Sequence, residues 1–272
     1  MRAAGFAVLV LSLLAAAGFA GTPAHGPLDL KGSLTQGGMA IGRLPAGSEV
    51  SLEGRKLRVS ADGVFVMGFD RDAGPTARID VVYPDGRAEH HTVKVEQRDF
   101  PIQRIDGLPP SKVTPGPEAL KRIRREQAMI DRARAVDAGR TDFAFPFIRP
   151  VEGRISGVFG SQRILNGKPR RPHYGIDYAA PKGTPVKAPA PGVVTLVHDD
   201  MYFSGGTIIL DHGHGISSVF IHLSRIDVET GQRVARGDLI GAVGVTGRAT
   251  GPHLHWGMNW FDKRLDPQLL VE

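Results

Sequence analysis

The 272-residue sequence contains no cysteine. This absence excludes disulfide bonds, a lipid-modified cysteine and every zinc finger built on thiolates, so any transition metal must be held by His, Asp or Glu. Aromatic residues make up only 7% of the chain, and no basic stretch is interleaved with them, which disfavours nucleic acid as a partner. Beyond the first residues, no segment is long and apolar enough to span a membrane.

Glycine and proline are plentiful, with 35 and 20 residues, and this favours short strands and turns over long helices. The chain is long enough for two modest domains, each with its own core. Its formal net charge of +6 suits an anionic surface such as a cell wall or a membrane without selecting one.

The first residues are typical of an export signal. Arg2 supplies a positive charge, and the apolar run Phe6–Ala17 is short and rich in alanine. Small residues then favour cleavage after Ala20, with Ala24 as a second candidate site and an uncleaved membrane anchor as the alternative. We therefore expect residues 1–20 to be a signal peptide. The mature chain should have no transmembrane helix and should lie in the periplasm or the extracellular cell envelope.

Residues 27–99 show short alternating runs separated by turn residues. The predicted strands are Glu49–Glu53, Lys56–Ser60, Ala77–Tyr83 and Glu89–Val95, the last two joined by a Pro84-Asp-Gly86 turn. Strands at this spacing predict a small antiparallel β-sandwich domain. This segment contains no clustered metal ligands or nucleophiles, so we expect it to act as a spacer, a docking module or a regulatory cover over an active site.

Residues 100–140 form a predicted linker and helix. The first part, 100–116, is rich in proline and glycine, and Pro117 then begins a helix to about Ala138, with Gly139 as its C-cap. The apolar side of this helix is thin, and its other faces carry many Arg and Lys. It either contacts an anionic wall polymer or packs along a domain edge as a solvated helix, and the second interpretation is favoured.

Residues 141–272 are predicted to be almost entirely β, with no helix of any length. The predicted strand segments are Gly183–Val197, Gly206–Leu210, Ser217–His222 and Gly231–Gly241, the last as a strand, turn and strand.

Two short segments of this region carry the residue types and spacings of a three-ligand zinc site: His173-Tyr-Gly-Ile-Asp177 and His253-Leu-His255. Side chains alternate along a strand, so His253 and His255 share a face, as do His173 and Asp177. Pro172 and Gly175 favour an extended segment over a helix at the first motif. If the two strands are neighbours, four zinc-competent side chains converge on one face.

Three protein ligands leave one position on zinc for a water, whose pKa falls to about 7. Such a water attacks an amide carbonyl, and a nearby imidazolium or N–H donor stabilises the resulting oxyanion. The remaining histidine on the face and His222 suit that role and proton transfer.

Six motifs occur in an order that resembles the lysostaphin-type, LytM-like zinc endopeptidases, across residues 144 to 270. They are Phe159-Gly, His173-x-Gly-x-Asp177, Ala180-Pro-x-Gly-Thr-Pro-Val186, Asp211-His-Gly213, His222-Leu-Ser224 and Thr250-Gly-Pro-His-Leu-His255. The resemblance implies that His173, Asp177 and His255 bind Zn²⁺ while His222 and His253 act on water and the tetrahedral intermediate. It also implies a compact antiparallel β metallopeptidase domain, related to barrel-sandwich hybrids, that hydrolyses peptide bonds in peptidoglycan cross-links. The peptide stems are the partner expected from this resemblance, with envelope proteins as further partners.

The sequence leaves the roles of His253 and His255 open to exchange. If zinc used His253 in place of His255, the fold would survive and the two roles would exchange. Asn166 and Tyr202 lie on predicted loops that frame the groove, and we expect these two residues to contact substrate. Phe220 and Trp256-Gly-Met depart from the family pattern without affecting the metal ligands.

Two other function classes compete with this interpretation. A non-catalytic LytM-like envelope protein that binds peptidoglycan or activates an amidase should lack ligands, and none is missing here. A swinging-arm carrier domain, suggested by the two hairpin-like stretches, needs a lysine at a tight exposed hairpin, which this sequence does not provide. Asp211, His212 and His214 are expected to support a turn.

Overall fold

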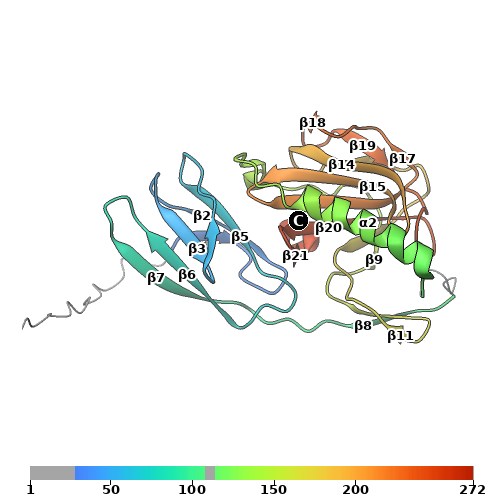
Figure 1. The fold of residues 1–272 in the computed structure, drawn as a ribbon, viewed down its shortest axis with the longest axis horizontal. Helices are drawn as coiled ribbons and strands as arrows, with labels where there is room; N and C mark the ends of the chain where they lie inside the picture. The colour runs from blue at the N-terminus through green and yellow to red at the C-terminus, as the bar shows by residue number, and fades with distance from the viewer. Residues whose placement is uncertain (1–27, 108–113, 272) are drawn as a thin grey trace, which may run out of the picture.

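The computed structural model of the protein describes residues 28–107 and 114–271 (Figure 1). Over these residues the chain is mainly β, with a single α-helix and two short 3-10 helices at Asp142–Ala144 and Pro267–Leu270. The predicted signal peptide, 1–20, lies outside the described residues. Within the described part, none of the helices is both long and apolar enough to traverse a bilayer.

Two small antiparallel sheets form the N-terminal part, in agreement with the alternating sequence pattern. Their strands are β1 (Leu30–Gly32), β2 (Met39–Arg43), β3 (Glu49–Leu52), β4 (Arg55–Leu57), β5 (Val64–Gly68), β6 (Thr76–Val82) and β7 (Ala88–Lys94). One sheet has the order β1-β2-β5 and the other β4-β3-β6-β7. Phe65, Ile79 and Val81 are fully buried in the core that these sheets share.

The predicted hairpin around Pro84-Asp-Gly86 is confirmed. Strands β6 and β7 pair with Val82 opposite Ala88, and the Tyr83 amide donates to the Arg87 carbonyl across the turn at 2.8 Å. Gly86 has a φ of 85°, which glycine adopts without a steric penalty.

Part of the segment interpreted as a linker, residues 100–116, forms a strand. Residues Ile102–Ile105 form strand β8, which pairs in parallel with β10 (Gln162–Leu165), and β10 continues into β11 (Lys168–Pro169). The local composition could not reveal this pairing, because the partner strand lies about sixty residues away in the sequence. As a result, the connecting segment is part of the C-terminal architecture.

Helix α2 (Pro117–Arg134) ends four residues before the predicted end at Ala138, because Ala135 is its C-cap. It packs on the main C-terminal sheet, as Figure 1 shows. The apolar contact joins Ala133, Met129 and Ile130 of the helix to buried side chains of that sheet: Leu196, Met201, Ile209 and Val219. Polar contacts add to it, since Glu126 accepts a hydrogen bond from the Tyr202 backbone amide at 2.8 Å.

The C-terminal part is built on one large antiparallel sheet with the order β18-β14-β15-β16-β20-β12-β9, and β21 pairs on β20. A second sheet has the order β13-β19-β17. The strands are β9 (Arg154–Gly157), β12 (Ile176–Ala179), β13 (Pro185–Lys187), β14 (Gly192–Met201), β15 (Gly205–Gly213), β16 (Ile216–Leu223), β17 (Arg225–Ile226), β18 (Arg233–Val234), β19 (Leu239–Ala242), β20 (His253–Trp260) and β21 (Lys263–Leu265).

The mainly β prediction for this region is confirmed, including the β15–β16 hairpin and the absence of any α-helix in residues 141–271. The expected strand, turn and strand over Gly231–Gly241 is confirmed by β18, the turn that follows it and β19. Strand β18 pairs with β14 and β19 pairs with β13 and β17, so the two strands belong to different sheets.

The N-terminal sheets and the C-terminal part share one continuous apolar core. Strand β5 lies against β20 and β21. At the same junction, the Arg98 guanidinium donates to the buried Asp266 carboxylate at 2.8 Å and to the Gln36 carbonyl at 2.9 Å. The Asp266 amide in turn donates to the Gly37 carbonyl at 2.7 Å.

Gly68 lets β5 approach the C-terminal strands, and this contact can be tested. A Cβ at Gly68 would lie 2.7 Å from a Leu265 methyl carbon and 3.0 Å from the Trp260 Cβ. We expect Gly68→Ala to lower the free energy of unfolding by about 1–3 kcal/mol, because overpacking a dense core forces its neighbours apart. Gly74→Ala is the control, since its Cβ would meet nothing closer than 3.9 Å. Equal stability of the two variants in urea titrations would contradict this packing.

Candidate metal centre

The two sequence motifs meet because β12 and β20 are neighbours. These strands pair antiparallel, with Asp177 opposite His255 and Ala179 opposite His253. His173 differs from the expectation, because β12 begins only at Ile176 and His173 lies in the preceding loop. Its position is set by backbone hydrogen bonds: its amide donates to Ser161 at 2.9 Å and its carbonyl accepts from Gly160 at 2.8 Å.

Three side chains direct one ligand atom each toward a common point. Asp177 Oδ1 lies 2.8 Å from His255 Nδ1 and 3.0 Å from His173 Nε2, and the two imidazole nitrogens are 2.9 Å apart. His173 and Asp177 are buried, while His255 is half-buried at the pocket surface. Two histidines and one carboxylate with their ligand atoms in one small cluster form a metal-binding arrangement.

The chemistry of this donor set fits a divalent cation. His173 Nδ1 faces the Val158 carbonyl at 3.0 Å, and a carbonyl only accepts, so Nδ1 carries the proton of the neutral ring. The lone pair on Nε2 then faces the carboxylate oxygen of Asp177, and a cation between the two acceptors removes their repulsion. In a tetrahedral zinc site the ligand atoms stand about 3.3 Å apart, so small outward shifts accommodate the ion.

Two glycines allow the ligands to pack closely, which explains the glycine inside the first motif. A Cβ at Gly175 would lie 2.6 Å from His255 Cε1 and 2.5 Å from the Trp256 carbonyl. A Cβ at Gly157 of β9 would lie 2.3 Å from Asp177 Oδ2. Any larger side chain at these positions would displace a ligand.

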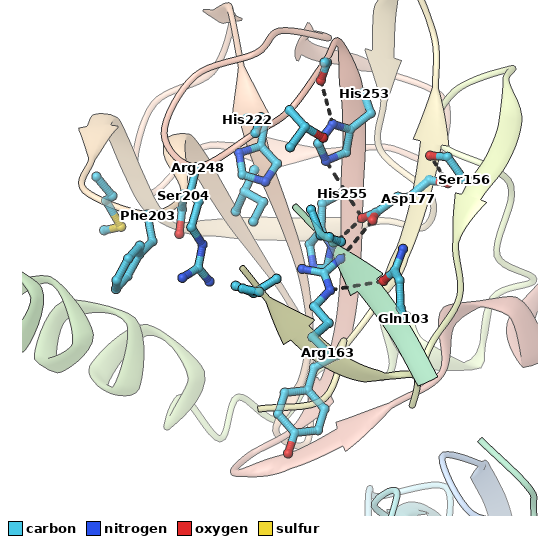
Figure 2. A pocket seen from close by; sticks show the side chains of 18 of the residues that line it. Gln103, Ser156, Arg163, Asp177, Phe203, Ser204, His222, Arg248, His253 and His255 are labelled. Atoms are coloured by element: carbon cyan, nitrogen blue, oxygen red, sulfur yellow. Dashed lines mark hydrogen bonds and ion pairs between the residues drawn. The ribbon is translucent and has the colours of Figure 1, made fainter. Parts of the chain in front are cut away.

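His222 and His253 stand beside the triad (Figure 2). Their ring centroids are 4.7 Å apart, and His253 Nε2 is 4.0 Å from Asp177 Oδ1. His222 Nδ1 donates to the Thr246 carbonyl at 2.8 Å and His253 Nδ1 donates to the Gly251 carbonyl at 2.8 Å. Both rings, when neutral, therefore carry their free lone pair on Nε2.

The site keeps its ligands in the forms that a metal requires. Burial lowers the pKa of His255 to about 4, so its imidazole is neutral at pH 7. Burial alone would raise the pKa of Asp177, but His173 and His255 beside it hold that pKa well below its ordinary value. Burial and the neighbouring His253 and His255 lower the pKa of His222 to about 3.

Arg163 and Gln103 support the carboxylate from outside the triad (Figure 2). Arg163 Nη2 donates to Asp177 Oδ2 at 3.1 Å, and its Nε donates to Gln103 Oε1 at 3.3 Å. Because Arg163 occupies Oδ2, Oδ1 stays directed at the two histidines. Arg163 lies on β10 and Gln103 on β8, so the segment expected to be a linker contributes to the site.

The triad opens into a groove with a cavity volume of about 550 Å³. Its walls come from β8, helix α2, the β14–β15 turn and the loop before β20. The loop contributes Arg248, and the helix contributes Glu126 and Arg134. The sequence motifs gave no signal for these wall residues, because Glu126 and Arg134 lie well before the first motif and Arg248, although close to His255 in the sequence, lies outside the motifs.

The structure places the two residues expected to contact substrate outside the groove lining. Asn166 has a φ of 47° and forms, with Gly167, the tight turn between β10 and β11. The Tyr202 ring packs on Phe203, which does line the groove. A substrate contact by Asn166 or Tyr202 stays a prediction.

Two further histidines of this region are held by neighbours. His212 is fully buried, with Nδ1 near the Pro191 carbonyl at 2.6 Å and Nε2 near the Ser218 hydroxyl at 2.8 Å. His214 is buried in the following turn, where its ring packs on Phe143. Neither belongs to the cluster of ligand atoms found among the described residues.

Comparison with known proteins places this geometry in a family. The profile of peptidase family M23 matches residues 171–267. This range includes the four histidines and the aspartate of the site: His173, Asp177, His222, His253 and His255. Residues of the chain are 43% identical over 110 residues to the peptidoglycan DD-endopeptidase ShyA of Vibrio cholerae, covering 39% of this chain and 25% of that protein. They are 44% identical over 106 residues to the DD-carboxypeptidase/endopeptidase Mpg of Neisseria meningitidis, covering 39% and 24%. The chain thus spans about a quarter of the length of these curated relatives.

A solved structure extends the likeness to nearly the whole chain. A protein from Pseudomonas aeruginosa assigned to peptidase M23 is 34% identical, with a TM-score of 0.69, over 88% of this chain and 95% of that one. The His/Asp/His triad of the chain is the metal-binding set typical of such peptidases. The chain therefore belongs to peptidase family M23, the lysostaphin and LytM-like peptidases.

Proposed function

We propose that the protein is an exported, zinc-dependent endopeptidase that hydrolyses peptide bonds in peptidoglycan cross-links. The observation that carries this proposal is the convergence of Asp177 Oδ1, His173 Nε2 and His255 Nδ1 within 2.8–3.0 Å of one another, at the floor of a groove. ShyA, a peptidoglycan DD-endopeptidase, and Mpg, a DD-carboxypeptidase/endopeptidase, are both peptide-cleaving enzymes by their names and support the substrate class.

In this proposal Zn²⁺ is held by His173, Asp177 and His255. When bound there, zinc supplies Lewis-acid chemistry, lowering the pKa of water and polarising a carbonyl. The geometry supports His255 over His253 as the third ligand, because its nitrogen lies 2.8 Å from Asp177 Oδ1 against 4.0 Å for His253.

His222 and His253 handle protons in the proposed reaction. The neutral His222 ring carries its lone pair on Nε2, so it can accept a proton from the attacking water. The protonated ring then donates a hydrogen bond to the developing oxyanion, and the proton passes to the leaving amine. His253 Nε2 lies 4.0 Å from Asp177 Oδ1, so its lone pair stands beside the proposed metal position and can take part in proton transfer there.

A non-catalytic role as a peptidoglycan-binding protein or amidase activator is the alternative function. The complete ligand set and the two additional histidines support the enzyme instead, because a binding protein needs neither. We further propose that residues 141–272 form the catalytic unit and that residues 27–99 dock or regulate it. Cell-wall substrate implies an envelope location, reached through the signal peptide proposed for residues 1–20.

Removal of the metal should abolish activity. We expect a chelator to stop the digestion of purified sacculi, and added Zn²⁺ to restore it. His255→Ala should lose both bound zinc and digestion, because it removes one of three ligands, whereas His90→Ala on the exposed face of β7 should retain both. The checks are elemental analysis and release of soluble muropeptides. Digestion by metal-free protein would rule out the proposal.

Removal of His222 should separate metal binding from chemistry. We expect His222→Ala to retain stoichiometric zinc while turnover falls by roughly 10²–10⁴, the usual contribution of a positioned acid–base group. The measurement is zinc content together with kcat on a cross-linked muropeptide, with His90→Ala again as the control. A full-rate His222 variant would show that the division of roles is wrong.

Crowding the ligands should weaken the metal site without touching a donor atom. A Cβ at Gly175 would press on the His255 ring, so we expect Gly175→Ala to bind zinc roughly 10–100-fold more weakly in a chelator competition. Gly139→Ala is the matched control, because its Cβ would have no neighbour within 4 Å. Unchanged zinc affinity in a folded Gly175→Ala protein would contradict the packing argument.

A further inference from the structure

The groove above the triad carries more positive than negative side chains. Its charged lining consists of four arginines and two acids: Arg134, Arg163, Arg248, Arg264, Glu126 and Asp177. Both acids already have partners within the protein. Glu126 accepts from Arg122 Nε at 2.6 Å and from the Tyr202 amide at 2.8 Å, and Asp177 belongs to the triad. The acids therefore leave an excess of positive charge in the groove, to which a bound metal would add.

The arginines come from four separate parts of the chain. Arg163 lies on β10 beside Asp177, and Arg248 lies on the loop before β20, with its guanidinium 4.3 Å from the Phe203 ring centroid. Figure 2 shows Arg163 reaching toward Asp177 and His255, and Arg248 beside Phe203. Arg264 of β21 donates to the Asn259 amide oxygen at 2.7 Å and has its guanidinium 5.5 Å from the Tyr174 ring centroid.

Arg134, in the last turn of α2, has a guanidinium that protein contacts leave partly unsatisfied within the described chain. Its Nε is buried without a hydrogen-bond partner among the described residues. Burial and the nearby positive charge of Arg264 lower the pKa of Arg134 well below its ordinary value, while burial and the positive charges of Arg163 and Arg170 lower that of Arg248 to about 10. Like charges gathered in a half-closed groove are costly unless an anion neutralises them.

We infer that this arginine-lined groove binds free carboxylates of the peptide substrate, so the enzyme selects stems with unmodified carboxylates over stems in which these groups are amidated. The inference rests on the proposed function, because it assigns the substrate class of the same site. Peptide stems carry carboxylates at free C-termini and at unmodified acidic residues. A planar guanidinium pairs with a carboxylate through two parallel hydrogen bonds, whereas a neutral amide offers it one acceptor and no charge.

The test uses the zinc-loaded full chain and two cross-linked muropeptide dimers that differ only in having carboxylates or carboxamides. We expect wild-type protein to cleave the carboxylate form with a kcat/KM about tenfold or more above that of the amidated form, since a charge-assisted hydrogen bond contributes on that scale. Arg134→Gln should reduce this ratio severalfold, mainly through KM for the carboxylate form, and Arg134→Lys should restore part of it.

Arg132→Gln is the matched control, because Arg132 lies in the same helical turn, is exposed and does not line the groove. It removes the same charge and should leave the ratio at the wild-type value. A second variant, Arg248→Gln, probes the opposite wall and should also lower the ratio.

The outcomes separate this inference from the proposed function. Equal cleavage of both dimers by wild-type protein overturns the inference and leaves the endopeptidase in place. A full wild-type preference in folded Arg134→Gln and Arg248→Gln proteins also overturns it. Cleavage of neither dimer by zinc-loaded protein removes the proposed function, and the inference falls with it.

Discussion

The site depends on the antiparallel register between β12 and β20. That register places Asp177 directly opposite His255, so two ligands from distant parts of the sequence reach one point without any loop rearrangement. A shift by one residue would turn Asp177 or His255 to the opposite face of the sheet. The buried side chains that alternate with the ligands on β20, Leu254 and Trp256, lock the register by filling the core on the other face.

The third candidate ligand, His173, is positioned by a loop instead of a strand. It lies on a loop, and its backbone is hydrogen-bonded to the segment at 160–161 that precedes β10. Arg163 follows this segment by two residues, on β10, and donates a hydrogen bond to the second carboxylate oxygen of Asp177. Strand β8 pairs along β10, so the connecting segment between the N-terminal sheets and helix α2 stabilises the strand that supports the carboxylate. The pairing of β8 with β10 therefore links the connecting segment to the support of Asp177.

The sequence alone predicted what depends on short-range patterns and left out what depends on long-range pairing. The hairpin at Pro84-Asp-Gly86 and the β15–β16 pair have local turn signals, and both were found. The candidate ligands stood out because His and Asp at spacings of two and four have a defined meaning for zinc. Strand β8 has no local signal, since its order comes from pairing with β10. The same limit applies to Arg134, which on a sequence pattern is one of many basic residues on a helix.

The positive groove and the neutral histidines are parts of one electrostatic arrangement. Ligation requires imidazoles without their second proton, and burial, together with the charge of Arg163, lowers the pKa of His255 to keep it in that form. Burial also lowers the pKa of His222. The positive charge of the groove therefore comes from guanidinium groups, which cannot be deprotonated at neutral pH, rather than from imidazolium. Such a field persists across the pH range in which the ligands stay neutral. In the proposed reaction this field would draw an anionic peptide toward the site. The backbone carbonyls that fix the histidine tautomers leave the Nε2 lone pairs of His222 and His253 free for the proposed proton transfer.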